Sequence, residues 1–404
     1  MSVPEEGLNE AIARHRAGDH AAAERGYREH LKQLPDDPSA LHFFGLLRNH
    51  QGRNREAIVL MLQALEGDPH YVDAWSNLGI AFYEERDLER AEKCCRRALE
   101  LAPNFVNAWA NLGMTMRARD RPEEALEAWG RALELEPTMR SVAVPYGRLL
   151  YRLDRIPEAM EFYRRWSLAS PDDPIPRHML AASGGTEQPS RAADDFVRAT
   201  FDDFADSFDR SLEQLQYRAP QLLCEALTAC GALAPAGALE ILDLGCGTGL
   251  CGPLLRPVAR RLVGVDLSPR MLSKAAARGL YDQLNSGELT AWLGECGQRF
   301  DVALAADVLC YFGDLAAVFE RIRAVLKPGG WFACSLEALP DDPGRRPYVL
   351  CPHGRYQHGR GYAEAELSKA GFEEVRLSQA TLRYERRDAV TGQLLLARAG
   401  QTAA

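Results

Sequence analysis

The chain has 404 residues, of which 46% are hydrophobic and 26% are charged, and its formal net charge is −9. This length suggests two or three domains, and the composition excludes a largely disordered chain, a collagen and a coiled-coil rod. The acidic charge argues against a general coat for nucleic acid or for anionic membranes. No apolar run reaches the ~18 residues of a membrane-spanning helix, and the acidic start is not a secretory signal, so we expect a cytoplasmic protein.

The ten cysteines are scattered along the chain, without a Cys-x-x-Cys pair or a zinc-type spacing. Such a pattern is typical of reduced thiols in a cytosolic protein. We therefore expect no metal site, with a redox or metal role as the alternative.

The first half of the chain repeats itself every 34 residues. Prolines, alanines and glycines each keep this step, and the prolines are Pro35, Pro69, Pro103, Pro137 and Pro171. Inside one unit, Trp75, Leu78 and Phe82 are three and four residues apart, which predicts one apolar face of a helix. A second helix follows and should end before Pro103, since proline lacks an N–H and disfavours a helical residue before it. Internal repetition of helix pairs is therefore the first prediction.

This pattern resembles the tetratricopeptide repeat. The residues that carry the resemblance best are Trp75, Leu78, Gly79, Phe82, Ala91, Ala98 and Pro103. It implies five repeats over residues 4–173, an all-α superhelix with a concave groove that holds a peptide or a partner protein. By repeat position, the groove should be lined by Asn49, His50, Tyr83, Arg117, Arg148 and Tyr151. The alternative is that these six are ordinary solvated side chains.

After Pro176 the repeat pattern stops, and we expect a linker over residues 174–195. Strands and helices then alternate. The expected strands are 239–244, 261–266, 300–305 and 331–336, and the expected helices include 269–278 and 315–326. This alternation predicts an α/β doubly wound, mostly parallel sheet that binds its ligand beyond the carboxyl ends of the strands.

The glycine-rich turn after the first of these strands is ambiguous by itself. Gly247, Gly249 and Gly252, with Asp266 about 20 residues further on, fit a dinucleotide-binding fingerprint. Read instead as Gly245, Gly247 and Gly249 preceded by Asp243, the turn resembles class I S-adenosylmethionine-dependent methyltransferases. The carboxylate of Asp243 favours the second interpretation, because a pyrophosphate would be repelled there. The segments 265–271 and 326–331 also resemble motifs of that family.

This second resemblance implies a Rossmann-like domain over residues 196–404 that binds S-adenosyl-L-methionine. The implied cofactor-binding residues are Asp243, Gly245, Cys246, Gly247, Gly249, Asp266, Leu267, Glu288, Leu289 and Ala305. Asp266 should accept hydrogen bonds from ribose hydroxyls. Glu288 stands where the family usually has an aspartate near the adenine amine, and a solvated surface carboxylate is its alternative.

The second half as a whole resembles bacterial methyltransferases fused to tetratricopeptide repeats. The segments that carry this resemblance are 201–209, 215–220, 305–314 and Arg355-Tyr356-x-His358. We expect catalytic roles for His353, His358 and Tyr311 and substrate contacts for Asp307, Tyr311, Arg355, Tyr356 and Tyr217. Histidine suits a general base because it titrates near neutral pH. Phe204, Phe208 and Tyr217 are expected in a helical lid, and plain helix packing is the alternative for the two phenylalanines. For the loop 351–362, which carries both histidines, the alternative is a polar connection between strands.

The resulting hypothesis is an enzyme that moves a methyl group to an O, N or C nucleophile of a small molecule or a carrier-bound intermediate. The repeats would recruit a protein partner, and neither nucleic acid nor a membrane is expected. One alternative is a protein methyltransferase whose repeat groove holds the substrate protein. A remote alternative is a non-enzymatic scaffold with a vestigial cofactor pocket.

Overall fold

The computed structural model describes residues 3–340, 346–385 and 388–401. The chain divides into two compact units, residues 1–159 and 160–404. Helix α10 (Ile156–Ala169) spans this division. Each unit is described by itself.

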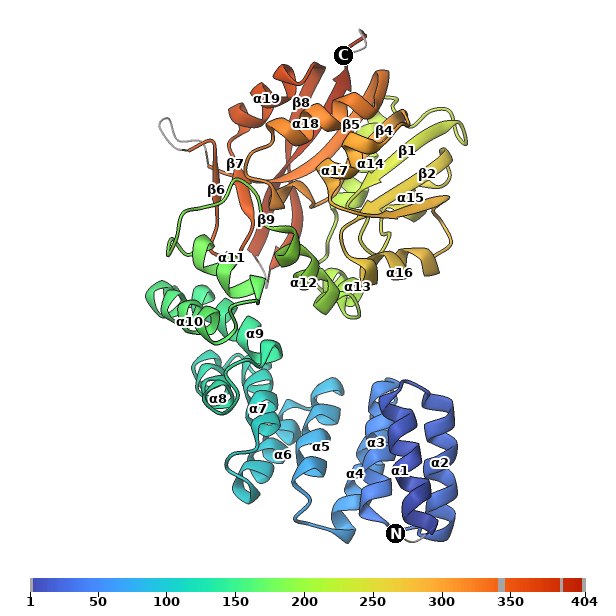
Figure 1. The fold of residues 1–404 in the computed structure, drawn as a ribbon, viewed down its shortest axis with the longest axis vertical. Helices are drawn as coiled ribbons and strands as arrows, with labels where there is room; N and C mark the ends of the chain where they lie inside the picture. Colours follow the sequence, from blue (N-terminus) through green and yellow to red (C-terminus); the bar gives the residue numbers. More distant parts are fainter. Residues whose placement is uncertain (1–2, 341–345, 386–387, 402–404) are drawn as a thin grey trace. The chain divides into compact units, whose positions relative to one another are not determined.

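The first unit consists of consecutive helices that pack on one another in chain order (Figure 1). They are α1 (Val3–Arg16), α2 (His20–Gln33), α3 (Pro38–His50), α4 (Asn54–Gly67), α5 (Val72–Glu84), α6 (Leu88–Leu101), α7 (Val106–Ala118), α8 (Pro122–Leu135), α9 (Arg140–Arg152) and the first part of α10. The repeat step predicted from the prolines therefore corresponds to one helix pair. The expected all-α repeat array is confirmed.

Two of the repeating glycines explain how the helices of one pair approach so closely. A Cβ atom added to Gly79 on α5 would lie 2.9 Å from Cys95 Sγ on α6. A Cβ atom on Gly113 of α7 would collide with the indole ring of Trp129 on α8. Only the smallest residue fits at these two contacts, so the repeated glycine is a packing requirement.

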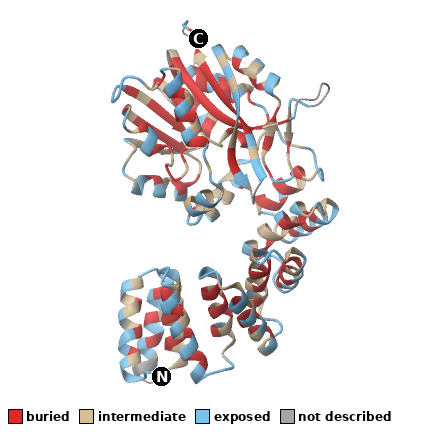
Figure 2. Cartoon of the chain, turned by 180° about the vertical axis from the view of Figure 1, so that it is seen from behind, coloured by how far each residue is buried: buried red, intermediate tan, exposed pale blue. Residues whose placement is uncertain are grey.

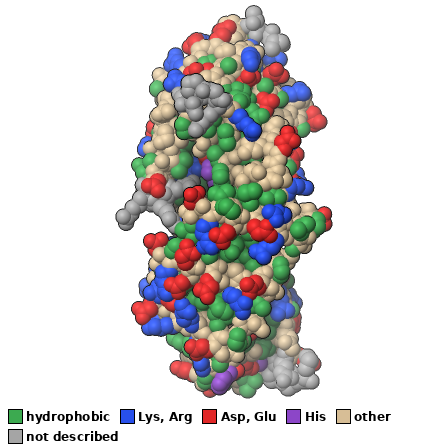
Figure 3. All heavy atoms as spheres, turned by 90° about the vertical axis from the view of Figure 1, so that its left-hand side faces the viewer, with side chains coloured by type: hydrophobic (Ala, Val, Ile, Leu, Met, Phe, Trp, Pro, Cys, Tyr) green, Lys and Arg blue, Asp and Glu red, His purple; other side chains and the backbone are tan. Residues whose placement is uncertain are grey.

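Ion pairs connect successive repeats on the surface of the array. Arg121 Nη1 lies 3.0 Å from Glu92 Oε2, and Arg155 Nη1 lies 2.7 Å from Glu123 Oε2. Acidic and basic side chains are interleaved on the face of the molecule in Figure 3. Pairs of this kind on an exposed surface contribute at most about 1 kcal/mol each, so the buried apolar contacts hold the array together.

Some of the residues expected in the repeat groove are engaged inside the array. Asn49 Nδ2 donates to Asn54 Oδ1 at 3.0 Å, and His50 Nδ1 lies 3.0 Å from His15 Nε2. Arg117 is exposed, with its guanidinium carbon 5.9 Å from the centre of the Trp129 ring. The role of these residues in binding a partner stays a prediction.

The segment expected as a linker, residues 174–195, contains helix α11 (Pro174–Ala182). Asp173 caps this helix, because its Oδ1 accepts the N–H of Ile175 at 3.0 Å, and Pro174 occupies the first turn. This is a strong helix start. The glycines after it, at positions 184 and 185, indicated a loop, and the helix that ends just before them was not expected.

The remaining helices and strands of the second unit form an α/β domain (Figure 1). The helices are α12 (Asp194–Phe204), α13 (Phe208–Gln214), α14 (Ala219–Ala229), α15 (Gly252–Leu255), α16 (Pro269–Ala277), α17 (Leu289–Glu295), the 3-10 helix η1 (Leu309–Tyr311), α18 (Ala316–Val325) and α19 (Arg360–Lys369). The strands are β1 (Leu239–Leu244), β2 (Ala259–Asp266), β3 (Gln283–Ser286), β4 (Phe300–Ala305), β5 (Leu326–Ala338), β6 (Tyr348–Leu350), β7 (Tyr356–His358), β8 (Phe372–Glu385) and β9 (Asp388–Ala399).

The strands make one sheet in the order β3-β2-β1-β4-β5, continued by the β6–β7 and β8–β9 hairpins. The first five strands are parallel, whereas β9 pairs with β5 in the antiparallel direction. Strand β1 therefore has β2 on one side and β4 on the other, which makes its carboxyl end the switch point where such folds bind ligands. The α/β doubly wound fold predicted from the sequence is confirmed.

The sheet is buried between two layers of helices (Figure 2). One apolar cluster includes Leu293 of α17, Phe319 of α18 and Leu367 of α19. The other includes Leu223 of α14 and Leu255 of α15. Because both faces are covered, the exposed strand ends are the part of the sheet that is open to a ligand.

Candidate active site

The turn after β1 has the backbone conformation that glycine permits. Gly245, Gly247 and Gly249 have φ angles of +62°, +54° and +87°. A side chain at Gly245 would also collide with Val308, which follows β4. The turn therefore brings bare backbone to the switch point, where a ligand can approach it closely.

Asp266, at the end of β2, holds this turn in place. Its Oδ2 accepts the N–H of Gly247 at 2.8 Å, and its Oδ1 accepts the N–H of Ser268 at 2.8 Å. Burial raises the pKa of Asp266, and the backbone hydrogen bonds partly counteract that effect. Each carboxylate oxygen can accept more than one hydrogen bond. The expected contact with ribose hydroxyls is compatible with this arrangement and stays a prediction.

Asp243, on β1, is almost fully buried, at 1% exposure. Its Oδ2 accepts the hydroxyl hydrogen of Tyr281 at 2.6 Å. Burial raises the pKa of Asp243 to about 7, so the carboxyl is poised between its two protonation states near neutral pH. A cation placed beside it would favour the charged form.

The other expected cofactor residues surround the same turn or follow the next strands. Cys246 and Ala305 are buried, and Leu267 is half-buried. Glu288 caps α17, because its Oε2 accepts the N–H of Ala291 at 2.8 Å, and Leu289 begins that helix. Arg191 Nη1 also lies 3.3 Å from Glu288 Oε1. The side chain of Glu288 is thus committed to local structure, and its role toward an adenine ring stays a prediction.

Helices α12 and α13 cover the glycine turn and its neighbours. A Cβ atom on Gly247 would lie 4.0 Å from Cε1 of Phe208, and the Phe204 and Phe208 rings meet edge to face at 5.4 Å. Asp202 Oδ1 accepts the hydroxyl hydrogen of Ser268 at 2.5 Å. These contacts hold α12 and α13 against the glycine turn, and their role as a lid stays a prediction.

A cluster of charged side chains lies at the carboxyl ends of β4 and β5: Asp307 follows β4, Glu337 is near the end of β5, and Arg383 on β8 joins them. Asp307, with φ +54°, is held by Ser335, whose Oγ accepts its N–H and donates to its Oδ1, both at 2.8 Å. Glu337 Oε1 accepts Arg383 Nη2 at 2.7 Å and Arg355 Nη1 at 3.2 Å. A left-handed backbone at a non-glycine residue is costly and is concentrated at functional sites.

The expected residues His353, Tyr311 and Tyr217 join this cluster. His353 Nε2 lies 3.4 Å from Glu337 Oε2, and the Arg355 guanidinium carbon lies 5.9 Å from the centre of the Tyr311 ring. Burial raises the pKa of Tyr217 well above its usual value, and the charge of Asp307 adds to this effect. Asp307, Tyr311, Arg355, Tyr217 and His353 are thus brought together.

Two expected site residues are structural instead. His358 is fully buried, its Nε2 donates to the Phe312 carbonyl at 2.7 Å, and burial lowers its pKa to about 4. This placement contradicts the expectation of a base that faces the mouth of the site. Tyr356 is also fully buried, and its hydroxyl donates to the Pro189 carbonyl at 2.7 Å. Tyr356 and His358 lie on one face of the three-residue strand β7, and Gln357 between them lies on the other. No sequence pattern predicted this strand.

Sequence reasoning missed Glu337, Arg383, Ser335 and Tyr281, which belong to strands or loops without a motif. It also missed the lid carboxylates Asp202 and Asp209, although the segment 201–209 was singled out as a whole. A signal existed for the lid, since acidic residues alternate there with phenylalanines.

The parts of the chain that the structure describes hold no group of three side chains suited to a metal ion. All ten cysteines are unpaired. Among the described helices, none is long and apolar enough to cross a membrane.

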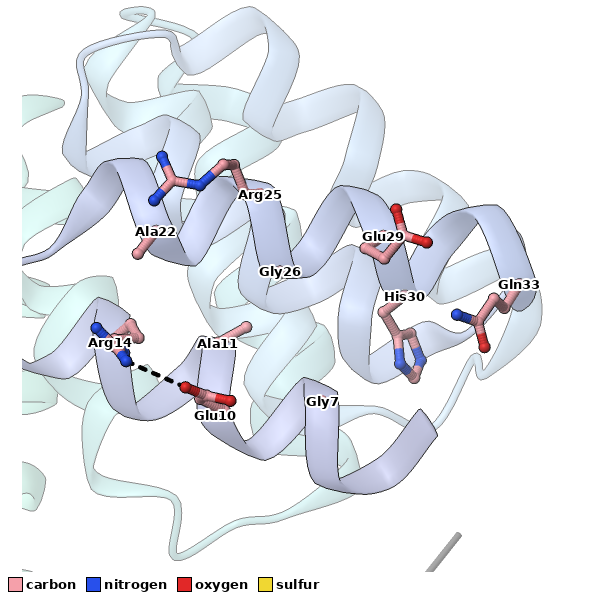
Figure 4. A pocket seen from close by; sticks show the side chains of 10 residues that line it. All are labelled: Gly7, Glu10, Ala11, Arg14, Ala22, Arg25, Gly26, Glu29, His30 and Gln33. Atoms are coloured by element: carbon pink, nitrogen blue, oxygen red, sulfur yellow. Dashed lines mark hydrogen bonds and ion pairs between the residues drawn. The ribbon is translucent and has the colours of Figure 1, made fainter. Parts of the chain in front are cut away.

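A further hollow lies between α1 and α2, lined in part by Gly7, Ala11 and Gly26 (Figure 4). Glu10 and Arg14 form an ion pair of 3.1 Å at its rim. A Cβ atom on Gly26 would lie 2.6 Å from that of Ala11. The hollow therefore lies where small residues let the two helices of the first pair approach each other.

Comparison with known families gives one kind of match for each half of the chain. The family described as "Methyltransferase domain" matches residues 242–332, and families described as "Tetratricopeptide repeat" match residues 72–105, 94–127 and 116–183. The second unit therefore contains an α/β methyltransferase domain, matched over residues 242–332. The chain as a whole is a tetratricopeptide-repeat array followed by that domain.

Curated relatives match the second half. Human methyltransferase-like protein 27 is 45% identical over 86 residues, which is 21% of this chain and 35% of that protein. A ubiquinone biosynthesis O-methyltransferase of Cereibacter sphaeroides is 32% identical over 126 residues, which is 30% of this chain and 51% of that protein. The chain thus spans between a third and a half of the length of these two relatives.

Solved structures resemble the chain in parts. A thermophilic tetratricopeptide-repeat protein of Thermus thermophilus is 20% identical, with a TM-score of 0.39, and the match covers 46% of this chain and 100% of that one. Magnesium protoporphyrin IX methyltransferase of Synechocystis with bound SAH is 18% identical, with a TM-score of 0.40, and the match covers 52% of this chain and 100% of that one.

Proposed function

We propose that this protein is an S-adenosyl-L-methionine-dependent methyltransferase acting on an O, N or C nucleophile of a small molecule or carrier-bound intermediate. The observation that carries the proposal is the hydrogen bond from the Gly247 N–H to Asp266 Oδ2 at 2.8 Å. This hydrogen bond joins the glycine turn to the carboxylate at the end of β2. The buried carboxyl of Asp243 lies on the neighbouring strand β1. The name of the Cereibacter relative, an O-methyltransferase, favours an oxygen acceptor.

The charge and conformation of these residues support the cofactor. We propose that the bare backbone of the glycine turn holds the methionine part, that Asp243 meets the α-ammonium group and that Asp266 accepts the ribose hydroxyls. When bound, S-adenosylmethionine would supply a methyl group already activated by the sulfonium.

The protein's own residues then have three tasks. The lid helices α12 and α13 exclude water from the site, which strengthens every electrostatic interaction inside it. Tyr217, Tyr311 and Arg355 orient the acceptor, and alignment of this kind contributes up to about 7–11 kcal/mol in favourable cases. Asp307 or His353 removes a proton where the nucleophile carries one; a positioned base adds about 10²–10⁴-fold in rate. Glu337 is unsuited to this task, because its ion pairs lower its pKa to about 2 even though burial alone would raise it.

Titration calorimetry on the intact chain tests the proposal. S-adenosylhomocysteine and S-adenosylmethionine should bind at one site, and NAD should not. Binding of NAD alone would support the dinucleotide interpretation of the same glycines. Binding of none of these three molecules would favour a scaffold with a vestigial pocket.

We further propose that the repeat array recruits a protein partner. The alternative, a protein methyltransferase whose groove holds its substrate, is separable by a labelling experiment. The intact protein is incubated with methyl-labelled S-adenosylmethionine and a cell extract. Label in the small-molecule fraction or on a carrier-bound group supports recruitment, and label on protein side chains supports the alternative. The same experiment can be run on a chain without the repeats. That chain should begin at Asp173, because His178 of α11 contacts the Gly354 carbonyl at 2.9 Å, next to Arg355 of the charged cluster.

A further inference from the structure

The charged cluster at the carboxyl ends of β4 and β5 is arranged in two layers. The inner layer consists of Glu337 and Arg383, whose side chains are 4% and 6% exposed and are joined by a hydrogen bond of 2.7 Å. The outer layer consists of Arg355 and His353, whose side chains are 29% and 49% exposed. Asp307 lies between the layers at 16% exposure. The side chains most open to a ligand are therefore the two that can carry positive charge.

Arg355 is held by an acidic partner and keeps 29% of its side chain exposed. Its Nη1 donates to Glu337 Oε1 at 3.2 Å, and the ring of Tyr311 lies 5.9 Å from its guanidinium carbon. Among the residues that the structure describes, Nε and Nη2 of Arg355 make no hydrogen bond. A guanidinium group with one side fixed and donors remaining is prepared for a planar anion.

The loop that carries Arg355 is also fixed. The Cys351 N–H donates to the Arg355 carbonyl at 2.8 Å, and His178 Nε2 donates to the Gly354 carbonyl at 2.9 Å. A side chain on a fixed loop loses less conformational freedom on binding, so it discriminates better between ligands.

The side chains around Arg355 determine which ligand charge the site favours. The carboxylates of Glu337 and Asp307 balance the charges of Arg383 and Arg355, so these four groups leave no surplus positive charge for a doubly charged ligand. The two carboxylates that would attract an amine are less exposed than Arg355, at 4% and 16% against 29%. The half-buried rings of Tyr217 and Tyr311 add apolar surface next to the charged group.

We propose that the methyl acceptor of this site carries a carboxylate group, and that Arg355 binds it. This inference rests on the proposed function, since it names the class of acceptor for the same site. Arg355 is then the residue that decides which molecules are accepted.

Fluorine NMR on the intact protein, saturated with S-adenosylhomocysteine, tests the inference. Four probes of similar shape are titrated: 4-fluorobenzoate, 4-fluorobenzamide, 4-fluorobenzylamine and 4-fluorophenyl phosphate. The benzoate should bind at least tenfold more tightly than each of the other three. Tighter binding of the amine, the amide or the phosphate overturns the inference, and this outcome depends on no variant.

Variants identify the residue. Arg355→Gln should weaken benzoate binding at least tenfold, while Arg355→Lys, which keeps the charge and loses the planar fork, should fall between it and the wild type. Arg360→Gln, an exposed arginine on α19 paired with Glu364, is the matched control and should leave benzoate binding unchanged. Equal benzoate affinity in the wild type and both Arg355 variants overturns the assignment.

The saturating ligand separates this inference from the function on which it depends. A protein that fails to bind S-adenosylhomocysteine refutes the proposed function. A protein that binds S-adenosylhomocysteine and prefers the amine refutes the carboxylate inference alone.

Discussion

Asp209, on lid helix α13, accepts the hydroxyl hydrogen of Thr248, which lies inside the glycine turn, at 2.6 Å. The other carboxylate oxygen of Asp209 accepts Arg278 Nη2 at 2.5 Å, and Arg278 Nε donates to the Thr248 carbonyl at 2.6 Å. The lid is thus joined to the turn that it covers by a closed set of polar contacts. In the proposed function, entry and exit of a ligand under α13 would require these contacts to open.

Replacing Asp209 should therefore change how long a ligand stays bound. In Asp209→Asn the charged pair with Arg278 is lost, so we expect S-adenosylhomocysteine to dissociate several-fold faster, with a smaller effect on association. Stopped-flow fluorescence measures both rates. Glu213→Gln, an exposed change on the same helix, is the control. Equal dissociation rates in the wild type and both variants would show that the lid is not held through Asp209.

Asp266 should be essential for cofactor affinity. Asp266→Ala removes the carboxylate that we propose as the partner of the ribose hydroxyls, and it releases the Gly247 N–H. Affinity for S-adenosylmethionine should therefore fall by at least about 1–3 kcal/mol, the usual cost of a lost charged hydrogen bond. Calorimetry measures the change. Glu295→Gln, an exposed carboxylate change on α17, should leave the affinity as it was. Unaltered affinity in Asp266→Ala would contradict the assignment.

Asp243 should make the stability of the free protein depend on pH. Burial raises its pKa to about 7, so between about pH 4 and pH 7 the folded protein holds a proton that the unfolded chain has released. The unfolding free energy contributed by this group is therefore present at low pH and lost as the pH rises through 7.

The comparison with Asp243→Asn isolates this effect. Because one pKa unit corresponds to about 1.4 kcal/mol, the unfolding free energy of the variant minus that of the wild type should grow by about 2–3 kcal/mol between pH 5 and pH 8. Urea unfolding at both pH values measures it. Parallel pH profiles for the two proteins would mean that Asp243 is ionised in the folded state throughout.

His353 and His358 should separate activity from stability. His358→Ala leaves a cavity and an unpaired Phe312 carbonyl, so it should destabilise the protein by about 2–4 kcal/mol. His353→Ala changes a half-exposed side chain, so it should alter stability by less than about 0.5 kcal/mol while lowering turnover. Thermal unfolding and a methyl-transfer assay measure the two effects. Full turnover in His353→Ala would show that the loop carrying His353 only connects two strands and takes no part in catalysis.

The sequence predicted those parts of the fold that depend on local chemistry. The repeat step appears in single residue types, such as the glycines at 79 and 113, because each repeat needs a small residue at the same contact. The glycine turn and Asp266 are likewise close in sequence, 19 residues apart at their shared hydrogen bond. Local spacing of this kind is preserved in the fold.

The charged cluster around Glu337 depends on contacts between segments that are distant in the sequence. β9 pairs with both β5 and β8, and this arrangement brings Arg383 of β8 within hydrogen-bond distance of Glu337 of β5. Nothing in either sequence segment indicates that the two residues meet. The two histidines of the 351–362 loop have similar surroundings in sequence. The short β6–β7 pairing decides that His358 is inside and His353 outside.

The most direct test of the account is a crystal of the intact protein soaked with S-adenosylhomocysteine and NAD together. The account predicts density for S-adenosylhomocysteine, with its amino group near Asp243, its ribose hydroxyls on Asp266 and its sulfur facing Arg355 and Tyr311. Density for the dinucleotide, with its pyrophosphate on the turn at 245–249 and no aminoacyl group beside Asp243, would contradict the account.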